Sequence, residues 1–278
     1  MHRRQFLRGT AASALPLSFP GISVNLKAPR MGLVVHSYAS RWQAKAPGAR
    51  FPAFANALDL LAHCHQIGAG GVQVTVNGWS DEFAKKVRDT REKLGLYLEG
   101  SIGLPRDEGD LARFDNEVRR AREAGAQILR TVTLGTRRYE TFRTAADFEE
   151  FRKRSLRSIQ LAEPVARKDV AKLAVENHKD WRAAELAALL KPLGSEWVGA
   201  TIDFGNNLAL LEDPTEVVQT LAPYALSTHI KDMAVEPYAD GFLLSEVPLG
   251  KGILDLPKLV SICRASNPAV TFSLEMIT

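Results

Sequence analysis

Four ionisable residues stand at or near the ends of four successive apolar runs in the second half of the chain. They are Glu176, Asp203, His229 and Glu275. Taken singly, a carboxylate in such a place is more often a helix cap or one half of a loop ion pair than a metal ligand. Three carboxylates and one imidazole in order form a stronger signal, because oxygen-rich ligation suits Mn²⁺, Mg²⁺ or Co²⁺, allows Zn²⁺ and disfavours thiophilic metals. The pattern predicts one divalent metal ion as cofactor.

The elements that must position these residues alternate between short strands and longer amphipathic helices, which indicates βα units around a parallel sheet. Eight such units close a TIM barrel, whose active sites lie at the carboxyl ends of the strands. Adjacent strands lie about 4.8 Å apart, so side chains from the last four strand ends can lean toward one point. The predicted strands are 32–36, 71–75, 96–101, 128–133, 172–176, 198–203, 226–231 and 269–275. The predicted helices are 54–66, 81–93, 108–123, 145–167, 182–190, 215–221 and 256–264.

The expected fold is therefore a single α/β domain, a (β/α)₈ TIM barrel over residues 31–278 that lacks its eighth helix. The sequence given ends at Thr278, three residues beyond the last predicted strand. The outer faces of strands eight and one would then lack their usual helical cover. We interpret this as truncation of the sequence, in preference to cover supplied by another chain.

Five further polar residues near the strand ends are candidates for binding the substrate. His178 and Asn206 follow two of the proposed ligands, and the alternatives are a loop histidine bonded to backbone and an asparagine that caps a turn. Lys231 alternates with His229 along its strand, so both side chains are expected to face the barrel interior. The remaining two, His36 and Glu99, are expected to line the far side of the pocket.

Two other motifs carry weaker signals for an anionic ligand. Gly250-Lys251-Gly252 has the composition of a phosphate cradle, but a plain turn before the helix start at Asp255 is the favoured interpretation. Arg137-Arg138 follows the fourth predicted strand and would meet an anionic substrate there, although a solvated loop is the default interpretation.

The first 30 residues have the composition of an export leader. They contain five basic residues and no acidic one, whereas the whole chain has a formal net charge of +4, so the remainder is close to −1. The run Arg3-Arg4-Gln5-Phe6-Leu7, followed by a mildly apolar segment, resembles a twin-arginine signal. We therefore predict a periplasmic or extracytoplasmic protein. The near-neutral body argues against nucleic acid as a partner, and the mature form is expected to have no membrane partner.

The second half of the chain resembles the xylose-isomerase-like TIM barrel superfamily of sugar phosphate isomerases and epimerases. The resemblance rests on five segments: Val175–His178, Asp203–Asn206, His229–Asp232, Gly250–Gly252 and Leu274-Glu275. It extends over roughly residues 30–278 and is specific only from Lys172 onward. It implies that Glu176, Asp203, His229 and Glu275 hold one divalent metal ion, and that the two glutamates flank the substrate as acid and base.

These observations favour a metal-dependent isomerase or epimerase that acts on a small sugar or keto-sugar through an enediolate intermediate. The alternatives are an exported lyase or hydrolase acting on oxidised (3-keto) glycosides, and a non-catalytic sugar-binding barrel. An apurinic-site endonuclease shares the fold, but it needs more histidine and acidic ligands and a basic face for DNA. Oligomeric state stays open, with a homo-oligomer among the alternatives.

Overall fold

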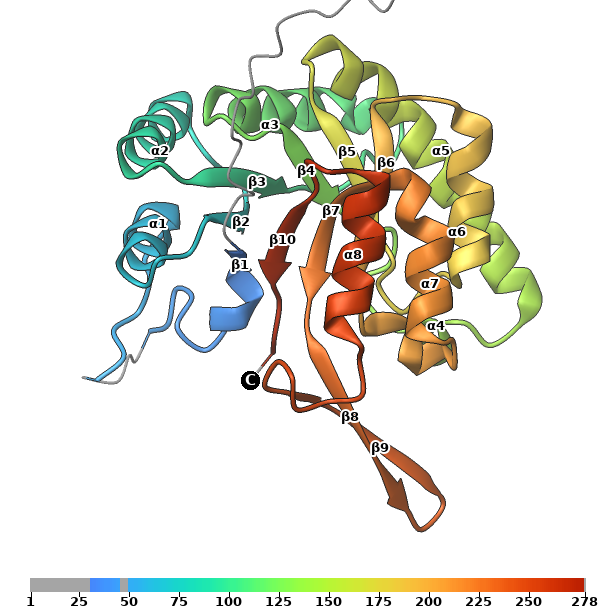
Figure 1. Ribbon diagram of the computed structural model, residues 1–278. Helices are drawn as coiled ribbons and strands as arrows, with labels where there is room; N and C mark the ends of the chain where they lie inside the picture. Colours follow the sequence, from blue (N-terminus) through green and yellow to red (C-terminus); the bar gives the residue numbers. More distant parts are fainter. Residues whose placement is uncertain (1–30, 46–49, 278) are drawn as a thin grey trace, which may run out of the picture.

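Eight parallel strands close into a barrel in the computed structural model, which describes residues 31–45 and 50–277 (Figure 1). Around the barrel the order is β1-β10-β7-β6-β5-β4-β3-β2. The predicted TIM barrel is therefore confirmed. The strands are β1 (Gly32–Val34), β2 (Gly71–Thr75), β3 (Tyr97–Ser101), β4 (Ile128–Thr131), β5 (Lys172–Glu176), β6 (Val198–Asp203), β7 (Ala225–Ile230) and β10 (Thr271–Leu274).

Helices surround this barrel and bury their apolar faces against it. They are α1 (Ala57–Gln66), α2 (Asp81–Leu94), α3 (Leu111–Glu123), α5 (Ala145–Lys168), α6 (Ala183–Leu190), α7 (Pro214–Leu221) and α8 (Leu256–Ser266). All seven correspond to predicted helices. One four-residue helix, α4 (Arg138–Thr141), was not predicted. Between β10 and Ile277, where the described part of the chain stops, there is no further helix. No helix among the described residues combines the length and apolar character that crossing a bilayer requires.

The helix boundaries follow from capping residues in the sequence. Ser80 accepts a hydrogen bond from the backbone N–H of Phe83 and starts α2, and Thr144 forms a capping box with Asp147 at the start of α5. Gly95 ends α2 in a left-handed conformation with φ of 66°, which glycine adopts without steric cost. These local signals explain why the predicted and observed helices agree within a few residues.

One end of the barrel interior is filled by the ring of Tyr97. A Cβ atom added to Gly71 would collide with that ring, so the ring fits only because this strand residue has no side chain. The Tyr97 hydroxyl donates a hydrogen bond to the backbone O of Phe272 at 3.1 Å, which ties β3 to β10 across the barrel. This contact holds together the side of the barrel where the first and last strands meet.

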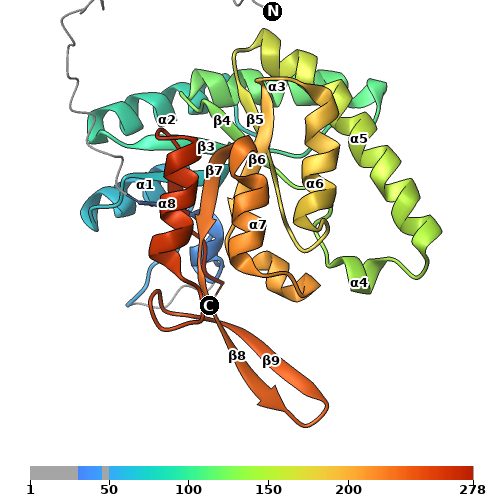
Figure 2. The same cartoon turned by 45° about the vertical axis from the view of Figure 1, so that its right-hand side comes forward.

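A two-stranded antiparallel hairpin, β8 (Asp232–Tyr238) and β9 (Gly241–Val247), leaves the barrel directly after β7. It extends away from the body of the molecule, at the end of the barrel where the strands terminate (Figures 1 and 2). Its tip exposes Tyr238, Phe242 and Leu243, whereas Met233 at its base is buried. The hairpin was not predicted, and its base forms part of the rim above the site described below.

Candidate metal centre

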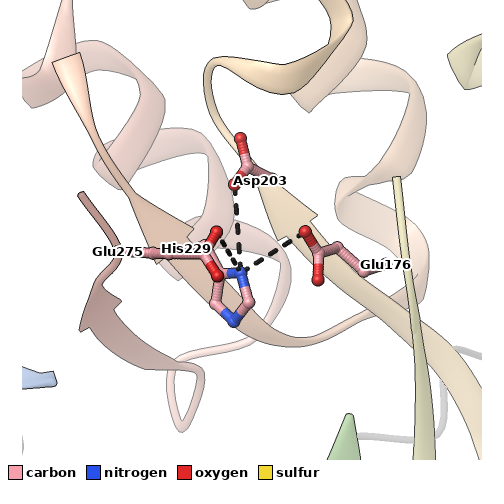
Figure 3. Close-up of side chains that lie close together, drawn as sticks. All are labelled: Glu176, Asp203, His229 and Glu275. Atoms are coloured by element: carbon pink, nitrogen blue, oxygen red, sulfur yellow. Dashed lines mark ion pairs between the residues drawn. The ribbon is translucent and has the colours of Figure 1, made fainter. Parts of the chain in front are cut away.

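The four residues singled out from the sequence converge at one point above the barrel (Figure 3). Each offers a ligand atom, and these atoms all lie within 4.8 Å of one another. The Nδ1 atom of His229 lies 3.2 Å from Glu275 Oε2, 3.6 Å from Glu176 Oε1 and 3.9 Å from Asp203 Oδ2. All four residues are buried. Their convergence is a geometric fact, and their role as metal ligands remains a prediction.

Strand pairing produces this convergence. Asp203 and His229 stand opposite each other on β6 and β7. Glu176 is the last residue of the neighbouring β5, and the backbone N–H of Glu275 donates to the backbone O of Ile230, the last residue of β7, at 2.9 Å. Consecutive strands therefore present the four side chains at the same end of the barrel.

Two atoms in the centre fit a bound cation. Among the described residues, His229 Nδ1 and Asp203 Oδ2 are buried polar atoms that receive or donate no hydrogen bond of suitable geometry. Their close partners are ionic instead: Lys231 Nζ lies 2.8 Å from Asp203 Oδ2, and Glu275 Oε2 lies 3.2 Å from His229 Nδ1. Both face the space between the carboxylates. One imidazole nitrogen with three carboxylates is a donor set for a hard or borderline divalent ion.

Asp203 is oriented by the loop that follows it and by the neighbouring strand. Its Oδ1 atom accepts hydrogen bonds from the backbone N–H groups of Gly205 and Asn206, at 2.9 and 2.8 Å. Asn177 holds the backbone of Asp203 from both sides, because its Oδ1 accepts from the N–H and its Nδ2 donates to the carbonyl. Only Oδ2 is then left to face the centre. Asn177 was not among the predicted site residues.

Lys231 supplies positive charge to one side of the centre. Its Nζ lies 2.8 Å from Asp203 Oδ2 and 3.1 Å from Glu275 Oε2. Burial would lower the pKa of Lys231, but these two carboxylates outweigh burial and raise it. Burial would likewise raise the pKa of Glu275, yet the charges of His229 and Lys231 hold it well below its usual value. The expectation that Lys231 shares the barrel interior with His229 agrees with the structure, and its closest contacts are to the proposed ligands.

Arg130, which the sequence reading missed, supplies positive charge to the other side. It lies on β4, its guanidinium pairs with Glu176 Oε2, and its Nη1 donates to Ser101 Oγ at 3.2 Å. Burial opposes ionisation of Glu176, but Arg130 and His229 lower the pKa of Glu176 below its usual value. The sequence did contain a signal for Arg130, because it is the one charged residue of β4. A charge buried in a strand needs a partner.

A chain of buried hydrogen bonds fixes the orientation of His229. Gln73 Oε1 lies 2.8 Å from His229 Nε2, and Gln73 Nε2 donates to Glu99 Oε2 at 2.9 Å. The other carboxylate oxygen of Glu99 accepts from the hydroxyl of Thr271. The Gln73 amide thus turns its N–H₂ toward Glu99 and its oxygen toward His229. His229 Nε2 therefore carries a hydrogen, and Nδ1 faces the three carboxylates.

The protonation state of His229 Nδ1 follows from the charges around it. Burial would lower the pKa of His229, but Glu275 and Glu176 outweigh burial and raise it to about 10. Without a metal ion, Nδ1 holds a proton at neutral pH. A metal ion would replace that proton without disturbing the hydrogen bond to Gln73.

The remaining predicted substrate residues fall into two groups. Asn206 Nδ2 donates to Glu176 Oε1 at 3.1 Å, and His36 Nδ1 lies 3.1 Å from Glu275 Oε1, so both contact the centre. His178 does not contact it, because its Nδ1 bonds the backbone O of Leu134 at 3.1 Å. Glu99 is buried inside the barrel, behind the Gln73 side chain that bonds His229. Gln73 and Thr271 satisfy the carboxylate of Glu99 there, and a contact of Glu99 with substrate remains a prediction.

The glycine-rich motif is a turn. Asp232 Oδ2 accepts the backbone N–H groups of Gly250 and Gly252, both at 2.9 Å, and a Cβ atom on Gly252 would collide with the same carboxylate. The backbone donors of a phosphate cradle are thus already occupied. This agrees with the favoured interpretation of the motif.

A pocket of about 440 Å³ adjoins the centre. Asn206 and Lys231 line it, and both also contact the proposed ligands. Arg137, Lys179 and Glu246 line it as well. This volume lies within the range of small-molecule sites, about 300–1,000 Å³. A molecule bound in the pocket would therefore touch the environment of the centre directly.

Comparison with known proteins shows the family of this chain and a relative that matches most of its length. The family model described as xylose isomerase-like TIM barrel matches residues 61–278. A 3-oxo-isoapionate decarboxylase from Pectobacterium atrosepticum is 26% identical over 244 residues, which is 85% of this chain and 82% of that protein.

Two solved structures illustrate the likeness of fold. A xylose isomerase-like TIM barrel protein from Mycobacterium smegmatis in complex with magnesium superposes with a TM-score of 0.65 at 17% identity, covering 88% of this chain and 89% of that one. The 3-keto-D-glucoside 4-epimerase from E. coli, in its apo form, gives 0.64 at 16% identity, covering 89% and 91%. At these identities the likeness concerns the fold alone.

Proposed function

This chain belongs to the xylose isomerase-like TIM barrel family, and from that membership we propose that it is a divalent-metal-dependent isomerase or epimerase of a sugar or keto-sugar. The observation that carries the proposal is the convergence of Glu176, Asp203, His229 and Glu275 around one point. These four side chains would hold the metal. Mn²⁺, Mg²⁺ and Co²⁺ suit the donor set, and Zn²⁺ is the alternative.

When bound, the cation would polarise a substrate carbonyl and stabilise the negative charge of an enediolate. The chain's own residues would move the protons. Glu275 is ionised and therefore suited to accept a proton from the carbon next to the carbonyl. His36 contacts Glu275 Oε1, and its side chain is 43% exposed, so it provides a path between that carboxylate and solvent.

Glu176 is the second acid–base candidate, and Arg130 and Asn206 position it. Return of a proton to the same carbon from the opposite face gives epimerisation. Delivery to the neighbouring carbon gives isomerisation. Both outcomes use one enediolate and the same two carboxylates.

Incubation of the metal-loaded protein with ketoses in D₂O tests this proposal. Proton transfer through an enediolate places solvent deuterium on the carbon next to the carbonyl while the carbon skeleton stays intact. If no deuterium enters any sugar that binds, the proposed isomerase or epimerase function is wrong.

Decarboxylation of a sugar-derived keto acid is the second candidate, favoured by the relative that matches 85% of this chain. Loss of CO₂ from a 3-oxo acid leaves the electrons of the broken C–C bond in an enolate, which a proton then quenches. The same electrostatic stabilisation serves this reaction, and no base is needed for the first step. Release of CO₂ together with shortening of the carbon chain distinguishes it from epimerisation.

We also propose that the protein is exported through the twin-arginine route. The basis is the Arg3-Arg4 pair and the apolar segment after it, which lie outside the described residues. Replacement of both arginines by lysine should retain the protein in the cytoplasm, as measured by cell fractionation.

A further inference from the structure

The pocket beside the metal centre has an uneven distribution of charge. Lys231 is already neutralised, because it contacts Asp203 and Glu275 and lies 3.7 Å from Glu246 Oε1. Glu246 in turn accepts the backbone N–H of Ile277 at 2.6 Å. The positive charge of Lys231 is therefore fully offset by these three carboxylates. The positive charge that is left on the pocket lining comes from Lys179 and Arg137.

Lys179 forms no ion pair with any carboxylate among residues 31–45 and 50–277. Its backbone is left-handed, with φ of 66°. That conformation costs roughly 1–2 kcal/mol for a residue with a side chain, and asparagine or glycine would adopt it more easily. A half-buried lysine held in this conformation on the wall of a pocket is therefore an unexpected residue for a purely structural loop.

Arg137 lies on the adjacent loop, and the backbone joins the two loops. The N–H of Arg138 donates to the carbonyl of Lys179 at 3.1 Å. Arg137 pairs with Glu140 at 2.7 Å, but both side chains are about half exposed (51% each), and exposed pairs of this kind contribute at most about 1 kcal/mol. The guanidinium thus remains available to an anion. Arg138 does not, because it pairs with Glu185 and covers the ring of Phe148.

From this arrangement we propose that the pocket binds a sugar that carries a carboxylate, with Lys179 and Arg137 as the carboxylate subsite. The inference rests on the proposed function and specifies its substrate class. A carboxylate fits better than a phosphate, because the backbone N–H groups of Gly205 and Asn206 on the pocket lining are bonded to Asp203 and are not free to cradle a phosphate. The sugar end reaches Asn206 and Lys231, and the acid end lies against Lys179 and Arg137.

Three ketoses that differ only at C6 test the inference. Isothermal titration of the Mn²⁺-loaded protein compares D-fructose, D-fructuronate and D-fructose 6-phosphate. We expect D-fructuronate to bind about 10- to 100-fold more tightly than D-fructose, as one charge-assisted hydrogen-bonded contact provides. Lys179→Asn should remove most of this preference, weaken D-fructose binding much less than D-fructuronate binding and not lower the Tm, because asparagine tolerates a positive φ.

Matched variants test whether the preference depends on the positive charge of these side chains or on a change in the fold. Lys179→Arg should keep the preference for the acid, Arg137→Gln should reduce it in part, and Lys191→Asn on the exposed surface should leave it unchanged. The inference is overturned if D-fructose binds as tightly as D-fructuronate, if Lys179→Asn weakens both sugars equally, if the phosphate binds most tightly, or if none of the three binds. Binding is measured without turnover. Preferred binding of D-fructuronate with no solvent deuterium in any sugar would therefore refute the isomerase or epimerase function while leaving the carboxylate subsite intact.

Discussion

His229 Nε2 and Gln73 Oε1 lie 2.8 Å apart, although their strands, β7 and β2, are separated by β10 and β1 in the barrel. The imidazole therefore spans the barrel interior. Its outer nitrogen belongs to the candidate metal centre, and its inner nitrogen is bonded to a residue 156 positions away in the sequence.

Replacement of Gln73 by leucine should weaken metal binding. The variant removes the acceptor that orients the ring, and loss of such a partner typically lowers metal affinity about 10- to 100-fold. Titration with Mn²⁺ measures the effect, and circular dichroism checks the fold. Gln127→Leu, at an exposed position, is the matched control. Unchanged affinity in Gln73→Leu would show that the hydrogen bond does not support the centre.

Metal affinity should rise with pH. The pKa of His229 is raised to about 10 in the metal-free centre, so below that pH a cation must displace the proton on Nδ1. The apparent association constant should then increase about tenfold per pH unit from pH 6 toward 9. Titration in two buffers of different ionisation enthalpy should also detect the released proton. A flat pH profile would mean that His229 Nδ1 is not a ligand.

Glu275→Gln should lower kcat by about 10²–10⁴ if this carboxylate is the base, since the amide keeps an oxygen for the cation but cannot accept a proton. His229→Ala should instead lower metal occupancy, as measured by elemental analysis. Full activity in either variant would contradict the assigned roles. The two readouts distinguish a lost base from a lost ligand.

Arg130→Met should destabilise the metal-free protein by about 3–5 kcal/mol at pH 7, because it leaves the buried carboxylate of Glu176 without its partner. The folded-state pKa of Glu176 lies below its unfolded value near 4.5. The stabilisation is therefore present above pH 4.5 and is lost as the pH falls through the folded-state value. Urea unfolding of both proteins should show the difference shrinking below pH 4.5, and a constant difference would refute this cause.

Gly71→Ala should lower the Tm by several degrees, because the added methyl group meets the ring of Tyr97 inside the barrel. Gly103→Ala adds the same group in open space and serves as the control. Equal effects of both substitutions would show that the close approach of Tyr97 is unimportant for stability.

Strands buried on both faces were the easiest elements to predict. The bounds of β2, β5 and β6 agree with prediction residue for residue, because near-continuous apolar runs are typical of parallel sheets. β1 is shorter than predicted, since Val35–Tyr38 turn into a 3₁₀ helix. The hairpin was overlooked although Asp240-Gly241 between apolar residues is a turn signal.

The four proposed ligands were identifiable from sequence because each stands at or next to the end of its own strand. Their supporting residues were not, because a pattern of residue types does not reveal partners. Arg130 lies 46 positions before Glu176, and only the closed barrel brings them together. Gln73 looked like one polar residue in a buried strand, and nothing local indicated that His229 would be its partner.

Glu275 follows β10, the strand that joins β1 to β7 and so completes the cylinder. Until that strand docks, only two carboxylates and one imidazole surround the site, and they would bind a cation weakly. Binding of the cation would then report that the barrel has closed. The bound cation and the closed barrel would stabilise each other. Removal of the cation with a chelator should therefore destabilise the pairing of β1 with β10 first.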